Sequence, residues 1–273
     1  MKNSKVSMES LKIDCQKVEH EILYFIQKIV EEAKAEGVVV GLSGGIDSSV
    51  VAVLCVKALG SGKVIGLLMP DSEITPTTDM EDAKNLSSKF GINTYTVSID
   101  FITKAFLENI PMDIDRVALA NIRARIRMAL NYYFANIFNY LVVGTGDRSE
   151  YLIGYFTKYG DGGNDLLPIA HLYKTQVKQL GKYLGLPIKI IDKPSSPQLW
   201  KGHKAIDEIP TDYDVLDLIL YTIFDLKMEN GKIVSQLNIN EKLIQDVHKR
   251  YKESMHKRSC PPTLKNRLNA HFK

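Results

Sequence analysis

Cysteine is scarce in this sequence, and the cysteines that it has are far apart. Cys15, Cys55 and Cys260 are the three among 273 residues, and their spacing matches neither a zinc site nor a redox motif. Such sparing use is typical of a reducing compartment, so we expect a cytoplasmic protein. Cys55 lies in an apolar run, where we expect it to be a small core residue.

Long apolar runs and a strong net charge are also missing. No stretch approaches the roughly 18 apolar residues of a membrane span, and the N-terminus lacks the apolar core of a signal peptide. The formal net charge of +3 is too small to indicate nucleic acid or a membrane as the main partner. The sequence shows neither an internal repeat nor a linker, so we expect residues 1–273 to form a single domain.

The sequence does have a regular alternation of helical and strand-like segments. Apolar side chains recur at helical spacing over residues 14–35, and residues 114–140 form a second long helical pattern. β-branched residues favour strands at 38–42, 64–69, 93–98, 140–144 and 188–191. This alternation predicts an α/β fold, with a doubly wound, mainly parallel sheet and helices on both faces. In such sheets ligands bind at the carboxyl ends of the strands, near the point where the strand order reverses.

The most distinctive stretch is Ser43-Gly44-Gly45-Ile46-Asp47-Ser48, which directly follows the first strand candidate. Two adjacent glycines let the backbone approach an anion closely, and the next residues open a helix whose unpaired N–H groups carry partial positive charge. This geometry suits nucleotide phosphates. The stretch lacks the ending of a Walker loop and the glycine pattern of a dinucleotide fold. The alternative is a tight strand-to-helix turn that binds nothing.

Two carboxylates beside glycine-rich stretches are candidates for a metal site. Asp47 would repel a phosphate unless a divalent cation such as Mg²⁺ lay between them. Glu150 follows Gly144-Thr145-Gly146 near the start of a short helical pattern. It is either a second ligand of that cation or a residue that only complements the helix dipole. The oxygen-rich stretch 161–165 lacks the glutamate that an EF-hand requires, which argues against a calcium loop.

The loop at 43–48 resembles the pyrophosphate loop of the N-type ATP pyrophosphatases. A second stretch runs from Gly144-Thr145 through Glu150 to Gly154-Tyr155-Phe156-Thr157-Lys158-Tyr159-Gly160-Asp161-Gly162-Gly163-Asn164-Asp165. With both stretches, the sequence is similar to the ammonia-dependent NAD⁺ synthetases. The similarity continues through 121–128, 166–177 and 193–196 and reaches His256-Lys257-Arg258, so it covers nearly the whole chain.

The resemblance implies an adenine nucleotide alpha hydrolase-like, Rossmann-like fold and the final reaction of NAD⁺ biosynthesis. In that reaction ATP, ammonia and nicotinic acid adenine dinucleotide, or deamido-NAD, give NAD⁺, AMP and pyrophosphate. A carboxylate is a poor acyl donor, so it is first converted into an acyl adenylate, which ammonia then attacks. No residue has to act as a covalent nucleophile, because the enzyme holds the reactants together and stabilises phosphate charge.

The resemblance also implies roles for individual residues. Those expected to bind ATP are Gly41, Leu42, Ser43, Gly44, Gly45, Ile46, Asp47, Ser48, Thr145, Lys174 and Ser195. Those expected to bind deamido-NAD are Arg125, Tyr132, Lys158, Asp165, His256 and Lys257. Asp47 and Glu150 are expected to hold Mg²⁺. Ser196 is a rival to Ser195, because the family commonly has alanine at this third position of the motif.

Without the resemblance, several of these residues have plainer interpretations. Lys174 could be an exposed lysine at the start of a helix. Arginines at 123, 125 and 127 cannot share one helix face, so at least one of them is solvated or structural. His256 and Lys257 could belong to a disordered basic tail.

The nitrogen donor and the oligomeric state follow from the same resemblance. Glutamine-using relatives carry an amidase domain with a catalytic cysteine, and this sequence has no cysteine-centred motif, so we expect free ammonia and no glutaminase domain. The family is homodimeric, and aromatic residues within 114–140 either supply the interface or are ordinary core. The stretch 200–208 differs from the shorter family pattern, and the loop that covers the active site could close differently.

Two other function classes remain open. Another adenylating ligase of the same loop class would call for paired cysteines, an RNA-binding domain or an added dimerisation domain. A non-enzymatic nucleotide-binding protein would be expected to lose Asp47 or Glu150, and both are present.

Overall fold

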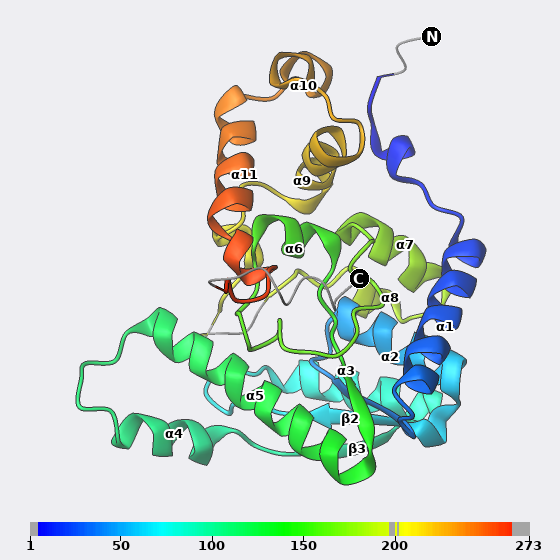
Figure 1. Ribbon diagram of the computed structural model, residues 1–273, viewed down its shortest axis with the longest axis vertical. Helices are drawn as coiled ribbons and strands as arrows, with labels where there is room; N and C mark the ends of the chain where they lie inside the picture. Colours follow the sequence, from blue (N-terminus) through cyan, green and yellow to red (C-terminus); the bar gives the residue numbers. More distant parts are fainter. Residues whose placement is uncertain (1–4, 197–199, 201, 264–273) are drawn as a thin grey trace.

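The computed structural model describes residues 5–196, 200 and 202–263 and contains a four-stranded parallel sheet, which lies in the lower half of Figure 1. Its strands are β1 (Gly37–Gly41), β2 (Val64–Leu68), β3 (Asn93–Thr96) and β4 (Tyr140–Val143), in the order β3-β2-β1-β4. β1 pairs with β2 on one side and with β4 on the other, so the strand order reverses beside β1. The predicted parallel sheet is confirmed.

Both faces of the sheet are buried, which explains the continuous apolar run of β1. Val38 and Val40 face one apolar cluster, whereas Val39 faces the other, as the two-residue period of a strand requires. All three valines are fully buried. A parallel strand covered on both sides needs this composition, because neither face meets water.

Helices cover the two faces of the sheet. On one face α2 (Ile46–Leu59) and α3 (Thr77–Phe90) contact the strands, and α1 (Cys15–Glu32) and α7 (Lys174–Tyr183) pack against α2. On the other face α5 (Arg116–Phe138) contacts the strands, and α4 (Asp100–Glu108) packs against α5. The predicted helices at 14–35 and 114–140 are therefore confirmed, with α1 capped by the carboxylate of Asp14. Cys55 of α2 is buried, as expected.

A further helical layer lies beyond the carboxyl ends of the strands. It contains α6 (Arg148–Ile153), α9 (Tyr213–Leu220), α10 (Asn230–Leu237) and α11 (Glu241–Glu253), which lie in the upper half of Figure 1. Their side chains share an apolar cluster that includes Ile153, Leu216 and Val247. Glu150 lies on α6 in this layer, which confirms the prediction that it lies near the start of a short helix.

The strand predicted at 188–191 is wrong, because this segment forms the helical turn α8 (Ile188–Ile191). Gly185, with φ of +71°, follows the end of α7, and Pro187 precedes the new turn. Ile190 and Ile191 are buried while Ile188 is 61% exposed, so the turn packs by one side only. A short β-branched run indicates a strand only where a sheet edge is within reach, and its composition cannot show that.

The described residues contain no helix that is both long enough and apolar enough to cross a membrane. The single domain expected over residues 1–273 extends past the described residues at both ends. The altered stretch 200–208 also includes Lys201, which lies outside the described residues.

Candidate active site

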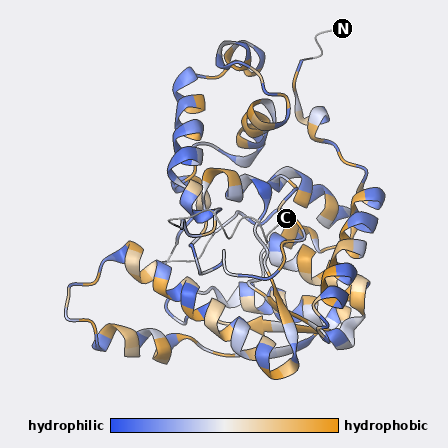
Figure 2. Cartoon of the chain, in the orientation of Figure 1, coloured by the Kyte–Doolittle hydropathy of each residue, from blue (hydrophilic) through white to orange (hydrophobic). Residues whose placement is uncertain are grey.

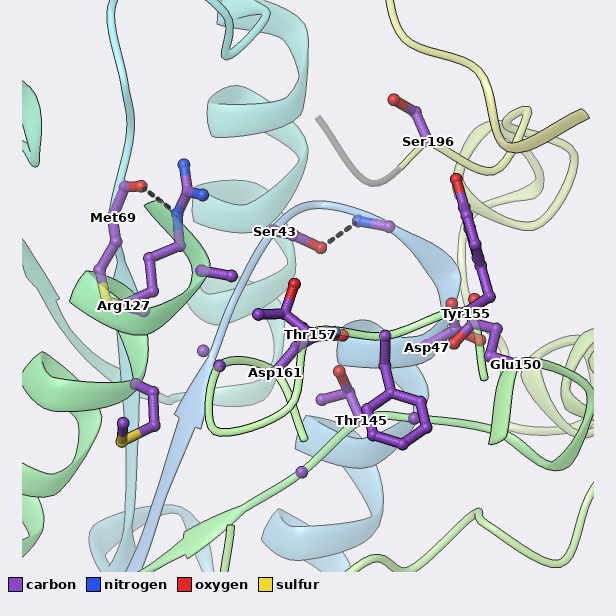
Figure 3. Close-up of a pocket in the computed structure, with 18 of the residues that line it drawn as sticks. Ser43, Asp47, Met69, Arg127, Thr145, Glu150, Tyr155, Thr157, Asp161 and Ser196 are labelled. Atoms are coloured by element: carbon purple, nitrogen blue, oxygen red, sulfur yellow. Dashed lines mark hydrogen bonds between the residues drawn. The ribbon is translucent and has the colours of Figure 1, made fainter. Parts of the chain in front are cut away.

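A cavity of about 430 Å³ opens at the carboxyl ends of β1 and β4, beside the point where the strand order reverses. Its wall combines the loop after β1, the loop after β4, one side of α5 and the segment after α8 (Figure 3). The lining residues considered below are Gly41, Leu42, Ser43, Gly45, Ile46, Asp47, Thr145, Glu150, Lys193, Ser195, Ser196 and Lys257. The volume is that of a site for one small molecule.

The loop at 43–48 turns sharply between β1 and α2. Gly44 has φ of +77°, and a Cβ at this position would lie 2.2 Å from the carbonyl oxygen of Asp79, so only glycine fits. The Ser43 hydroxyl accepts a hydrogen bond from the Gly45 N–H at 3.3 Å. The loop is therefore shaped by its own hydroxyl groups and by its contact with α3.

The N-terminus of α2 is directed at the cavity. Gly45 is the N-cap residue, and both Ile46 and Asp47 of the first turn line the cavity. Further along, residues 50–54 are each at most 1% exposed, so α2 is packed on all sides. Since the first N–H groups of a helix have no partners within it, this end provides an anion site on a helix that is held rigidly.

Lys174 is fully buried, and its ammonium group lies among three carboxylates. Nζ is 2.6 Å from Asp47 Oδ2, 2.9 Å from Asp147 Oδ2 and 3.0 Å from Glu150 Oε1. It also lies 5.2 Å from the centre of the Tyr213 ring. We call Asp47, Asp147, Glu150 and Lys174 the inner cluster. The alternative interpretation of Lys174 as an exposed lysine is wrong.

The inner cluster holds one cation for three carboxyl groups, and its pKa values follow from this imbalance. Burial raises the pKa of Glu150 to about 8 and that of Asp147 to about 6; Lys174 opposes both shifts, and the neighbouring carboxylates add to them. Burial alone would lower the pKa of Lys174, but the three carboxylates raise it well above its usual value. Lys174 is therefore a permanent cation, and the excess negative charge favours a bound proton or a further cation.

Buried hydrogen bonds from α9 fix the backbone of Lys174. Its N–H donates to Ser149 Oγ at 3.0 Å, and that hydroxyl donates to Asp217 Oδ1 at 2.5 Å. The N–H of Thr175 donates to Asp217 Oδ2 at 2.8 Å. Burial raises the pKa of Asp217 to about 6 against the effect of these hydrogen bonds. One carboxylate thus holds the first turns of α6 and α7 together.

The chemistry of the donor oxygens fits Mg²⁺. Asp47 Oδ1 is buried and has no hydrogen-bond partner among the described residues, and the side chains of Asp47 and Glu150 are each 21% exposed. Mg²⁺ commonly takes one or two protein carboxylates and completes its shell with water and substrate phosphates. In the described part of the chain, no group of three or more acidic, histidine or cysteine side chains is arranged to hold a metal ion.

Three predicted ATP contacts line the cavity from different sides. Thr145 follows β4, whereas Ser195 and its rival Ser196 both lie on the segment after α8. The Ser196 hydroxyl donates to the carbonyl of His203, and the carbonyl of Ser195 accepts from the Ala205 N–H at 3.0 Å. Both serines thus border the cavity, and each helps to anchor the segment that carries it.

Four of the predicted deamido-NAD contacts form a separate group outside the cavity lining. Arg125 donates to the Lys158 carbonyl at 3.3 Å, and the Tyr132 hydroxyl donates to Asp165 Oδ1 at 3.0 Å. Arg125 and Asp165 are exposed, and the other two are half-buried. We call Arg125, Tyr132, Lys158 and Asp165 the outer group.

The remaining two predicted contacts, His256 and Lys257, lie in a short helical turn rather than in a tail. Lys257 lines the cavity, and its Nζ donates to the carbonyls of Gly154 and Phe156, both at 2.7 Å. His256 is exposed and lies outside the described lining of the cavity. The structure therefore brings only one of the pair to the cavity.

Arg123 and Arg127 of α5 confirm that the three arginines do not act alike. Arg123 is buried, and its Nε donates to Asp71 Oδ2 at 2.7 Å. Arg127 donates to the carbonyl of Met69 at 3.0 Å and lines the cavity. Only Arg125 of the three is exposed, so Arg123 is structural and Arg127 shapes the wall.

Sequence reasoning gave no role to two residues of the site, Asp147 and Lys193. Asp147 caps α6 through the Glu150 N–H at 2.9 Å, and an acidic residue three positions before a helical glutamate could have signalled this cap. Lys193 contacts the carbonyl of Gly44, about 150 positions earlier in the chain, at 2.9 Å. No local pattern reveals such a contact.

Comparisons with known proteins agree with this geometry. The model of the NAD synthase family matches residues 18–261. An NH3-dependent NAD⁺ synthetase of Staphylothermus marinus is 48% identical over 92% of this chain and 92% of its own length. The solved structure of an NMN synthetase from Francisella tularensis has a TM-score of 0.82 and 34% identity, covering 92% of this chain and 99% of that one. The solved structure of an NH3-dependent NAD synthetase from Campylobacter jejuni has a TM-score of 0.79 and 33% identity, covering 93% of this chain and 100% of that one.

Proposed function

The chain belongs to the NAD synthase family, and on that premise we propose that it catalyses the ATP-dependent amidation of deamido-NAD by ammonia. The products are NAD⁺, AMP and pyrophosphate. The observation that carries the proposal is the meeting, in one cavity, of the N-terminal end of α2 with Asp47 and Glu150, both of which pair with the buried Lys174 behind them. A site for phosphates and a site for a cation thus share one wall.

The proposed chemistry needs the chain to hold two reactants and to stabilise negative charge. Loop 43–48 and Thr145 would bind the polyphosphate, and a serine at 195 or 196 would bind ATP from the segment after α8. Lys174 would contribute a fixed positive charge close to the leaving pyrophosphate. A preorganised charge of this kind costs no reorganisation when the bond to the α-phosphate breaks.

Asp47 and Glu150 are the residues that would hold Mg²⁺. Asp47 Oδ1, which has no hydrogen-bond partner among the described residues, and the excess negative charge of the inner cluster support this assignment. A bound Mg²⁺ supplies neutralisation of phosphate charge and orientation of the pyrophosphate leaving group.

Deamido-NAD would extend from the cavity over the outer group. A cavity of about 430 Å³ suits one nucleotide, so a second, larger substrate has to lie partly on the surface. Arg125 and Lys158 supply positive charge for its phosphates, and the ring of Tyr132 supplies a face for stacking. Lys257 would approach it from inside the cavity, and His256 from the rim.

A homodimer is part of the proposal, and the surface beside α5 supports it. α4, α5 and the segment between them expose large apolar side chains, and Figure 2 shows the hydrophobic character of α4. These side chains are Phe101, Phe106, Ile110, Met112, Ile114, Val117, Tyr133 and Ile137, each 42% to 84% exposed. Exposed apolar surface of this extent is typical of an interface with another chain. A second copy seated there would also cover part of the outer group.

The proposed nitrogen donor is free ammonia. The chain aligns over at least 92% of its length with relatives that carry NH3-dependent in their names. The proposal includes a single domain without a glutaminase, and a cytoplasmic location. ATP and the reducing conditions that keep cysteines as thiols both belong to that compartment.

A second candidate substrate is nicotinic acid mononucleotide. The likeness to an NMN synthetase, at a TM-score of 0.82, favours it. The same acyl adenylate chemistry would then act on a nicotinate that lacks the second nucleotide, and less of the outer group would be used. The two candidates therefore differ in what the surface outside the cavity does.

A single experiment tests the function and separates the two substrates. The purified protein would be incubated with ATP, Mg²⁺ and either deamido-NAD or nicotinic acid mononucleotide, with ammonium or glutamine as nitrogen donor, and the amide product and AMP would be measured together. We expect NAD⁺ and AMP in equal amounts with ammonium alone. A higher kcat/KM with the mononucleotide would replace the first substrate by the second. The absence of AMP with both substrates would refute the ligase.

A further inference from the structure

Lys193 contacts the loop at 43–48, which we call the phosphate loop, and acceptors of the protein already engage its N–H donors. Its Nζ donates to the Gly44 carbonyl at 2.9 Å, to Asp79 Oδ1 at 2.7 Å and to Asp82 Oδ2 at 2.6 Å. An ammonium group has three N–H donors, and these three acceptors occupy all of them. Although Lys193 lines the cavity, it could reach a bound phosphate only by giving up one of these contacts.

The contact with Gly44 controls the direction of an adjacent N–H group. The carbonyl of Gly44 and the N–H of Gly45 belong to one planar trans peptide unit, so they point in opposite directions. While Lys193 holds the carbonyl, the Gly45 N–H stays turned to the other side, where Ser43 Oγ accepts it at a long 3.3 Å. A hydroxyl group can rotate away, which leaves this N–H available to an anion.

Glycine makes this peptide unit easy to misplace. Gly44 has φ of +77° and Gly45 φ of −87°, and a glycine pair has many alternative conformations of similar energy. A loop that binds an anion through backbone N–H groups therefore needs something outside itself to select one conformation. Asp79 supports this unit in two ways, because its carbonyl lies beside Gly44 and its carboxylate accepts a hydrogen bond from Lys193, which holds the Gly44 carbonyl.

We propose that Lys193 is a positioning residue for the reaction, which holds the Gly44–Gly45 peptide in the orientation that receives the phosphates of ATP. Asp79 and Asp82 of α3 neutralise Lys193 and hold it in place, so it acts through the loop and not on the substrate. Lys193 directly precedes Pro194 and Ser195 of the cavity wall. The same ammonium group therefore links the loop to the segment after α8 that forms part of the cavity wall. The identity of the anion rests on the proposed function.

The test compares Lys193→Met with Lys189→Met in the full-length protein. Lys189 pairs with Asp82 in the same network, but it is 58% exposed and its ion pair is with α3 and not with the loop. Affinity would be measured by calorimetry with inorganic pyrophosphate and with ATP, each with Mg²⁺. We expect Lys193→Met to weaken both by about 10- to 100-fold, as for a reactive group displaced by about 1 Å, and Lys189→Met to leave both unchanged. Equal effects of the two substitutions would overturn the proposal.

Asp79→Asn distinguishes a positioning role of Lys193 from direct binding of phosphate by Lys193. It also provides the test if Lys193→Met does not fold. A positioning role predicts weaker pyrophosphate binding in Asp79→Asn, because Lys193 loses its anchor. If Lys193 instead bound phosphate directly, this change would free it, and affinity would be kept or increased, which would overturn the proposal. In turnover, the KM for ATP should rise while the KM for ammonium stays constant. Binding of pyrophosphate is measured without NAD⁺ formation, so failure of the proposed function is seen separately.

Discussion

The inner cluster and the outer group differ in what fixes their side chains. In the inner cluster, α2, α6 and α7 each contribute charged groups, and Lys174 is held by three carboxylates within 3.0 Å. In the outer group, Arg125 makes one long hydrogen bond within the described part of the chain, at 3.3 Å to a backbone carbonyl, and it stays exposed. One chain is therefore enough to build the proposed ATP side of the site. The proposed deamido-NAD side depends on what covers it.

The largest expected effect comes from removing the cation of the inner cluster. In Lys174→Met, three carboxylates remain in a buried space without their partner. Breaking a buried ion pair on one side costs about 3–5 kcal/mol, so the free energy of unfolding should fall by that amount. Urea unfolding of the variant and of the parent protein measures it. A loss below about 1 kcal/mol would mean that water already screens this cluster.

The stability of Lys174→Met should also depend on pH in a defined direction. The folded pKa values of Glu150 and Asp147 are raised, so the folded state keeps protons that the unfolded state releases, and stability falls as pH rises from about 4 to 8. Without Lys174 these pKa values rise further, which makes the decline steeper. The deficit in stability relative to the parent protein should thus be smaller at pH 5 than at pH 8, as urea unfolding at both values would show. A deficit that grows toward pH 5 would contradict this sign.

Asp47→Asn should leave the fold intact and abolish most of the activity. The substitution keeps the size of the side chain but removes a charged oxygen that has no hydrogen-bond partner among the described residues. We expect the Mg²⁺-dependent rate of AMP formation to fall more than about 100-fold, with little change in melting temperature. Near-normal turnover would refute the metal assignment.

In the outer group, the expected effect is smaller and confined to one substrate. Arg125→Met removes an exposed charge, and loss of a charged hydrogen bond to substrate corresponds to roughly a tenfold rise in the KM for deamido-NAD. The KM for ATP and the free energy of unfolding should stay the same. Steady-state kinetics with each substrate varied in turn provides the measurement. An equal rise in both KM values would show that the two regions are not separate.

The smallest expected effect is on the reactivity of two cysteine thiols, Cys55 in the buried helix α2 and Cys260 at the surface. Burial raises the pKa of Cys55 to about 12, so at pH 8 its thiol should not react with a thiol reagent in the folded protein. Cys260 is exposed and should react within minutes. Timed thiol titration followed by mass spectrometry identifies each site. Labelling of Cys55 without denaturant would reveal opening of α2.

The sequence was sufficient for features that depend on local pattern. The four strands of the sheet, α1, α5 and the glycine loop all follow from periodicity and turn chemistry within a few residues. The sheet order then brings Asp47 and Glu150 together, because parallel strands end at one edge. At 188–191 a short apolar run was not enough to distinguish a strand from a helical turn, since only the tertiary structure shows whether a sheet edge is near.

Contacts between distant parts of the chain were beyond the sequence pattern. The Lys193 ammonium group reaches Asp79 and Asp82 across more than 100 positions, and Asp217 reaches the start of α7 across 42. From the sequence alone, each of these residues would be interpreted as an ordinary charged residue on the surface. Burial of a polar side chain with several partners is the feature that marks it, and burial is a property of the folded chain.

The close packing of α2 also affects how the protein folds. A helix that is apolar on every side gains little from forming alone in water, so we expect it to consolidate only together with β1 and the helices around it. Its first turn carries the backbone proposed to bind the phosphates, and that backbone takes its shape when the hydrophobic nucleus closes. A nucleotide bound there as proposed would bind only chains whose nucleus is complete, so ATP would shift the equilibrium away from partly folded forms.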